Sequence, residues 1–92
     1  MRFEWDPYKA AANVKKHGIS FEEATTVFGD PLSITIFDPD HSNGEDRFIT
    51  IGMSAKEHLM VVIHADRAKG IRIISARDVT GAEGRQYYEK GI

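Results

Sequence analysis

The pattern of apolar and polar positions is helical in the first third of the chain. Asp6 and Pro7 follow a short alternating segment and are typical of a helix start, and Gly18 is the expected end of that helix. Ser20 and Glu23 have the spacing of a capping box, and the apolar residues after them recur at helical intervals. This part of the sequence predicts a short edge strand followed by two helices.

Beyond residue 31 the apolar period changes to two, the period of a half-buried strand. Strands are predicted over residues 32–37, 47–53, 59–64 and 71–75, with turns at 38–44 and 66–70. The segment 59–64 is apolar on both faces, so we expect it to be the central strand. Thr80 and Glu83 form a second capping box, which predicts a closing helix through Lys90.

This order of elements predicts an α+β fold with a short N-terminal strand, two helices, an antiparallel meander of about four strands and a C-terminal helix. With 92 residues the chain can build one core, so we expect a single domain over residues 1–92. Aromatic residues supply much of the core of a small domain, and we expect Trp5, Phe21 and Phe28 to lie in it.

Composition narrows the possible functions. The absence of Cys excludes a disulfide framework, a thiolate metal site and a cysteine nucleophile. The longest apolar run, Leu59–Ile63, is far too short to span a membrane, and the polar start of the sequence has no signal-peptide core. We therefore expect a cytoplasmic protein without a membrane partner.

The formal net charge of −2 is unevenly distributed. Residues 1–45 hold four basic and eight acidic side chains, whereas residues 46–92 hold eight basic and six acidic ones. This balance excludes a protein that binds nucleic acid through bulk charge, but it permits a local patch of Lys and Arg.

A series of short motifs runs in order through nearly the whole chain. It consists of Phe3-Glu-Trp-Asp-Pro7, Lys9, Asn13, Lys16-His17-Gly18, Phe21-Glu-Glu-Ala24, Val27-Phe28, Asp30-Pro31, His41-Ser42, Glu45, Arg47, Ile51-Gly52, Arg72-Ile-Ile-Ser-Ala-Arg77, Glu83 and Tyr88-Glu89. No single motif is specific, but the ordered series resembles the BrnT family of bacterial toxins.

The resemblance implies a RelE-like fold and a ribonuclease toxin of a type II toxin-antitoxin module, which cleaves RNA without a metal ion and blocks translation. It also implies a BrnA-like antitoxin with a ribbon-helix-helix DNA-binding domain. Such an antitoxin silences the toxin, and the complex represses its own promoter, so the toxin reaches DNA only through its partner. We expect no cofactor.

Metal-free cleavage uses the neighbouring 2′-hydroxyl of RNA as nucleophile, so the protein must supply a base, an acid and cations. We expect Lys16, His17, Arg47 and Arg77 to be catalytic and to converge on one concave face. His17 is the better group for proton transfer because imidazole titrates nearest neutrality. The residues expected to bind RNA are Arg72, Glu45 and Tyr88.

Each of the four residues expected to be catalytic also has a structural interpretation. Lys16 and His17 can cap the last carbonyls of the first helix. Arg47 and Arg77 can form surface ion pairs, with Glu45 or Asp46 in the first case and with Asp78 or Glu83 in the second.

Alternation along the last predicted strand separates two of the arginines. Arg72 faces away from Ile71 and Ile73 if alternation holds, whereas Arg77 shares the parity of those two residues. Stacking on an RNA base needs an exposed ring, for which the best placed residues are Tyr87, Tyr88 and Phe48.

A metal site is not expected. Residues 38–42 resemble the start of a calcium loop, but the glycine falls one place late at Gly44, and Ile49 stands where a bidentate Glu is required. His58 and His64 share strand parity but lie roughly 20 Å apart at strand rise. Zinc bound by residues far apart in sequence is the metal alternative left open.

A second hypothesis is a non-catalytic protein-binding module of the same shape, acting as an antitoxin partner or co-repressor. A docking module has no reason to gather Lys16, His17, Arg47 and Arg77 in one place. Expression without the partner separates the two hypotheses, because only the toxin arrests growth.

Overall fold

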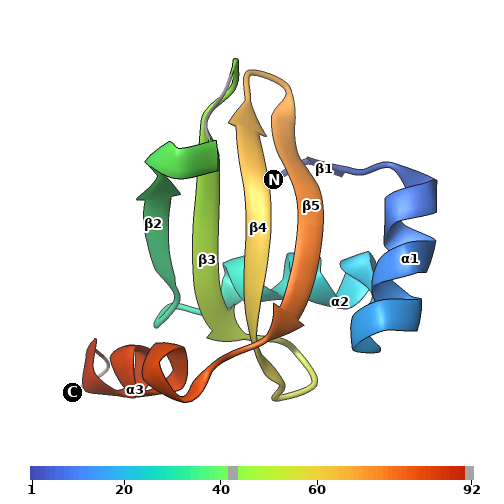
Figure 1. The fold of residues 1–92 in the computed structure, drawn as a ribbon. Helices are drawn as coiled ribbons and strands as arrows, with labels where there is room; N and C mark the ends of the chain where they lie inside the picture. The colour runs from blue at the N-terminus through green and yellow to red at the C-terminus, as the bar shows by residue number, and fades with distance from the viewer. Residues whose placement is uncertain (42–43, 91–92) are drawn as a thin grey trace.

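The computed structural model describes residues 1–41 and 44–90, which form one five-stranded sheet with helices around it (Figure 1). The elements in chain order are β1 (Phe3–Glu4), α1 (Pro7–His17), α2 (Phe21–Thr25), the 3-10 helix η1 (Thr26–Gly29), β2 (Ile34–Asp38), the 3-10 helix η2 (Pro39–His41), β3 (Arg47–Met53), β4 (Leu59–Arg67), β5 (Gly70–Asp78) and α3 (Gly81–Lys90). The predicted α+β class and order of elements are confirmed.

The strand order is β1-β5-β4-β3-β2, so β4 is the central strand, as its continuous apolar character predicts. Strands β2 to β5 pair antiparallel, and β1 adds to the β5 edge in parallel. The turn predicted over 66–70 is shorter, since β4 extends to Arg67 and β5 begins at Gly70. The turn predicted over 38–44 contains η2, and its residues Ser42 and Asn43 lie outside the described residues.

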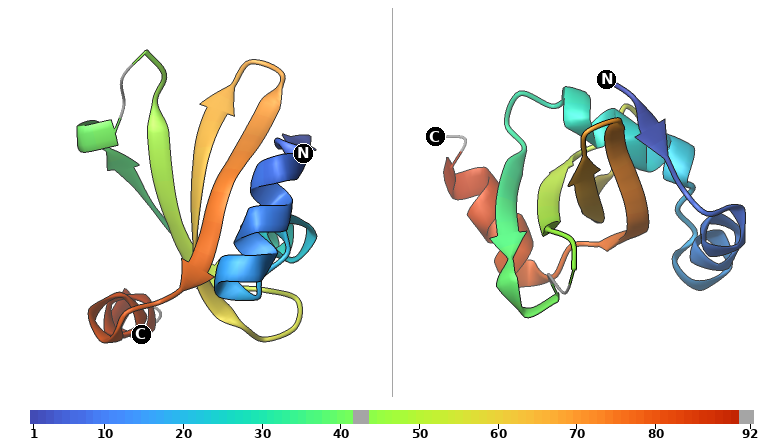
Figure 2. Two further views of the ribbon diagram at one scale, coloured as in Figure 1. Left: turned by 45° about the vertical axis from the view of Figure 1, so that its right-hand side comes forward. Right: turned by 90° about the horizontal axis from the view of Figure 1, so that it is seen from above.

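The two faces of the sheet are covered differently (Figure 2). On the face that we call the back, α2 and η1 pack over a core that includes Phe21, Met60, Val62 and Ile73. Phe21 is fully buried, as predicted, and Trp5 and Phe28 are partly buried against the same core. On the front face, α3 covers the lower end of the sheet, where Ile34, Ile51, Val61 and Tyr87 form a second core.

A β-bulge in β5 changes which side chains share a face. The register pairs Ile63 with Ser75 but His64 with Ile73, so Ile74 is an extra residue on β5. The extra residue restores Arg72 and Arg77 to the same face. The prediction from strict alternation, which placed these two arginines on opposite faces, is therefore wrong.

Asn13 closes the outer edge of β5 where β1 no longer covers it. Its side-chain amide donates to the carbonyls of Ile19 and Ala76, both at 2.9 Å, and its oxygen accepts from the Ala76 amide at 3.1 Å. The Asn13 side chain thus takes the place of a neighbouring strand, because it satisfies both backbone groups of Ala76. This contact fixes α1 against β5.

The central position of β4 predicts the effect of a cavity there. Val62 is fully buried, so Val62→Ala is expected to lower the free energy of unfolding by roughly 1 to 3 kcal/mol. Alanine substitutions at Asp38, Asp40 and His41, in the 38–44 segment, should each cost less. Urea midpoints measure both effects, and larger losses in the segment would contradict the packing described here.

Asn13→Ala should also destabilise the fold, by about 1 to 3 kcal/mol, because it leaves buried backbone groups of Ile19 and Ala76 without their partner. Gln86→Ala removes an amide from an exposed position of α3 and serves as the matched control. Equal urea midpoints for the two variants would show that the edge contact contributes nothing.

Candidate functional site

A row of charged side chains crosses the upper front face of the sheet. The register places Asp38 opposite Arg47, Arg47 opposite Ala65, Ala65 opposite Arg72, and Arg72 beside Glu4. Side chains at directly paired positions point to the same face, so all five strands contribute to this row. The two arginines flank Ala65, which is fully buried.

Glu45 joins the arginines at the top of this row. Its carboxylate accepts hydrogen bonds from Arg67 at 3.0 Å and from Arg72, and Arg67 also lies 3.7 Å from Glu4. The hydrogen bond from Arg67 lowers the pKa of Glu45, and the charges of Arg72 and Arg47 act in the same direction. We call the group Asp38, Glu45, Arg47, Arg67 and Arg72 the upper arginine cluster.

The surface below the cluster is apolar and open. The next row across the sheet consists of Ile36, Ile49, Ile63 and Ser75. Ile36 is 39% exposed, and the ribbon shows no helix over this part of the front face between η2 and α3 (Figure 1). Within residues 1–41 and 44–90, the buried Nε of Arg72 has no hydrogen-bond partner. The accessible part of this region is thus the apolar row, and the Nε of Arg72 is buried beside it.

Arg77 lies on the same face but at its lower end. Ala65, the partner of Arg72, and Val61, the partner of Arg77, are four residues apart on β4, which is roughly 13 Å at about 3.3 Å per residue. Arg77 forms a bidentate pair with Glu83, at 2.8 and 2.9 Å, and this hydrogen-bonded pair lowers the pKa of Glu83 to about 2. The ion pair with Glu83, one of the two partners predicted for Arg77, is confirmed.

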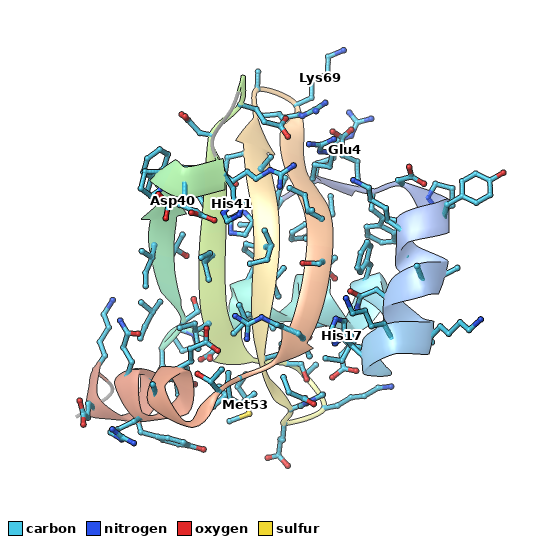
Figure 3. The ribbon with its side chains drawn as sticks, in the orientation of Figure 1. Glu4, His17, Asp40, His41, Met53 and Lys69 are labelled. Carbon is cyan, nitrogen blue, oxygen red and sulfur yellow. The ribbon has the colours of Figure 1, made fainter. Side chains whose placement is uncertain are left out.

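Lys16 and His17 do not lie on the sheet. They are at the end of α1, which runs beside β5 (Figures 1 and 2). His17 follows Asn13 by one helical turn and therefore faces the last residues of β5, as Figure 3 shows. Lys16 is exposed. The structure brings Arg47 and Arg72 together, and it leaves Arg77, Lys16 and His17 at the other end of β5.

The tyrosines of α3 differ from each other in exposure. Tyr88 is 61% exposed, as a residue that contacts RNA or a partner requires. Tyr87 is buried, and its hydroxyl donates to Asp30 at 2.6 Å; burial and this carboxylate raise the pKa of Tyr87 to about 12. The Tyr87 ring is therefore not available to stack on an RNA base, contrary to the prediction. Phe48, also predicted for that role, instead stacks on the buried His64 of the back face.

Sequence reasoning missed two residues at the site. Arg67 reaches Glu45 because the β4–β5 hairpin is tighter than predicted, so the arginine ends β4 instead of lying in a turn. The Nδ1–H of His41 donates to the Asp38 carboxylate at 2.8 Å. Its spacing of three residues from Asp38 is the signal that could have indicated this pair.

A pocket of about 350 Å³ lies away from the arginines, at the lower end of β3. Its lining consists of Thr26, Gly29, Asp30, Met53, Ser54 and Ala55. The Asp30 carboxylate there accepts from the Tyr87 hydroxyl and from the Met53 amide at 2.8 Å, so it anchors α3 to β3. The polar groups of this pocket therefore serve to hold α3 in place, and its lining contains no basic side chain.

Among the described residues, no helix is long and apolar enough to cross a membrane. Within the same residues, no group of three or more His, Asp or Glu side chains is arranged to hold a metal ion.

A comparison with curated proteins gave no significant match. A comparison with protein families matched the model described as "Ribonuclease toxin, BrnT, of type II toxin-antitoxin system" over residues 5–83. The matched region includes the upper arginine cluster, Arg77 and the end of α1. Because the match covers most of the sequence, the chain belongs to the BrnT family of ribonuclease toxins of type II toxin-antitoxin systems.

Proposed function

We propose that this toxin cleaves RNA without a metal ion, on the front face of its sheet, and thereby blocks translation in the cytoplasm. The observation that carries the proposal is the pair Arg47 and Arg72, on either side of the buried Ala65. In this reaction the 2′-hydroxyl attacks the adjacent phosphorus, and the products end in a 2′,3′-cyclic phosphate and a 5′-hydroxyl. The protein must then stabilise the charge on the pentacoordinate phosphorus, which guanidinium groups do well.

The contacts of Glu45 support a phosphate site at this place. A carboxylate and a phosphate both present two oxygens to a guanidinium fork, and Glu45 is held by Arg67 and Arg72 together. We propose that Glu45 keeps the arginines extended until a phosphate of RNA shares them.

Arg77, Lys16 and His17 have a second place in this proposal, because they lie near the lower end of β5. An RNA strand that follows β5 from the upper cluster reaches them. We propose that they hold the substrate beyond the scissile phosphate, and that Tyr88 of α3 provides an exposed ring for a base. The proposal gives them this binding role in place of the catalytic role predicted from the sequence, because the scissile phosphate is placed at the upper arginine cluster.

The partner is proposed to be a BrnA-like ribbon-helix-helix antitoxin that covers the front face. Carboxylates of the antitoxin would pair with the arginines, and an apolar anchor would pack on Tyr88 and on the exposed Ile36. With a net charge of −2, the toxin itself has no charge-driven reason to bind promoter DNA. DNA binding therefore belongs to the antitoxin.

The decisive experiment is incubation of the purified toxin with total RNA in EDTA. Cleavage that yields 2′,3′-cyclic phosphate ends supports both the reaction type and its independence from metal ions. Intact RNA, together with normal growth on expression of soluble toxin alone, would instead favour the non-catalytic docking module.

Arg72→Ala should lower kcat/KM for RNA cleavage by about 100-fold, because a positioned donor to the developing charge is lost. Arg72→Lys should recover only part of this loss, since an ammonium lacks the bidentate fork. Arg85→Ala removes an exposed arginine of α3 and is the matched control, expected to stay within about threefold of the wild type. Similar rates for the Arg72→Ala and Arg85→Ala variants would remove the upper cluster from the reaction.

Arg77→Ala should reduce toxicity while the antitoxin complex still assembles, because apolar anchors at an interface usually outweigh charges at its rim. Growth after induction and pull-down with the antitoxin measure the two effects. Glu83→Gln is the control, since it breaks the same ion pair but retains the guanidinium. Equal loss of toxicity in both variants would show that Arg77 acts by holding α3 and not on RNA.

A further inference from the structure

His41 and Asp38 form a pair at the left margin of the front face. The Nδ1 atom of His41 lies 2.8 Å from Oδ2 of Asp38. The aspartate side chain is only 13% exposed, whereas the imidazole is 67% exposed. A carboxylate at Nδ1 fixes the proton on that nitrogen, which leaves Nε2 as an accessible proton acceptor.

The position of η2 directs this pair toward the arginines. Asp38 is the direct cross-strand partner of Arg47, so the aspartate of the pair belongs to the charged row. The ribbon from above shows η2 on the front side of the sheet (Figure 2), and Figure 3 shows His41 over the front of β3. An imidazole, a carboxylate and a guanidinium therefore gather beside the open apolar surface.

The other three histidines are placed differently. His64 is buried and bonded through both ring nitrogens, to Thr50 at 2.7 Å and to Asp66 at 2.8 Å. His58 lies between two carboxylates below β4. His17 is at the end of α1, at the lower end of β5. Of the four, only His41 combines an exposed ring with a place next to Arg47.

We infer that His41 is the general base of the cleavage reaction and that Asp38 positions it. This inference rests on the proposed function and adds to it the residue that takes the proton. The 2′-hydroxyl transfers its proton to Nε2 as the 2′-oxygen bonds to phosphorus. The bond from phosphorus to the 5′-oxygen then breaks, water protonates the leaving oxygen, and the imidazolium returns its proton to solvent.

The test uses the full-length toxin, free of antitoxin, and a short RNA that contains one cleavage site. His41→Ala should lower kcat by about 100-fold or more, the usual contribution of a positioned base. Because the ring is exposed, added imidazole should restore a measurable part of the rate. Asp38→Asn should cause a smaller loss that imidazole does not restore.

A second substrate separates base from acid. In RNA whose leaving 5′-oxygen is replaced by sulfur, departure needs no protonation, so a missing general acid costs little. The His41→Ala variant should be as impaired on this substrate as on ordinary RNA. Full recovery on the sulfur substrate would make His41 an acid and overturn the assignment.

His58→Ala is the matched control, because it removes a partly exposed imidazole paired with Asp78 and Glu23, outside the proposed site. Its rate should stay within about threefold of the wild type. A His41→Ala variant that retains that rate, or one whose loss imidazole does not restore, overturns the inference. Wild-type toxin that leaves RNA intact would instead contradict the proposed function itself.

Discussion

The extra residue Ile74 in β5 is the constraint on which both faces of the sheet depend. Ile73 and Ala76 belong to the back core, although they are three positions apart and would lie on opposite faces of a regular strand. The bulge lets both pack there and turns Arg72 and Arg77 to the front. In an unbulged strand one arginine would enter the apolar back core, where an unpaired charge is strongly unfavourable.

Once both arginines face forward, α3 determines the partner of Arg77, whereas Arg72 pairs with Glu45 at the other end of the face. The Arg77–Glu83 pair and the hydrogen bond from Tyr87 to Asp30 hold the helix over the lower front face. Glu83 also caps its own helix, since its carboxylate accepts from the Thr80 amide at 2.8 Å. One glutamate therefore connects the start of α3 to β5. The upper half of the face remains open as a consequence of where the helix is anchored.

Local signals in the sequence predict the elements well. Gly18 ends α1 with a φ of 70°, Ser20 caps α2, and Thr80 and Glu83 form the reciprocal box at α3, because each depends on residues three or four apart. The central position of β4 follows from its apolar faces. The bulge at Ile74 has no comparable signature, since a single inserted residue leaves both neighbouring segments looking like strand.

The site was harder to predict for the same reason. Whether Arg72 joins Arg47 depends on the register of three strands, and the burial of Tyr87 but not Tyr88 depends on how α3 meets the sheet. Arg67 and His41 gain their partners from a hairpin and a 3-10 turn. Residue type therefore identifies some of the candidate site residues, whereas which of them lie together is decided by the tertiary structure.

In the proposed function, the balance of charge in the upper arginine cluster is what lets a toxin with a net charge of −2 bind RNA. Arg67 and Arg72 share Glu45, so the cluster presents aligned guanidinium groups without a large excess of positive charge. A phosphate that binds there as proposed competes with the carboxylate of Glu45, which is already bonded. Nonspecific polyanions gain little from such a site, because bulk electrostatic attraction is weak. A phosphate binds more tightly where other contacts along the front face hold the RNA in place. This charge balance therefore favours recognition by geometry over attraction by net charge.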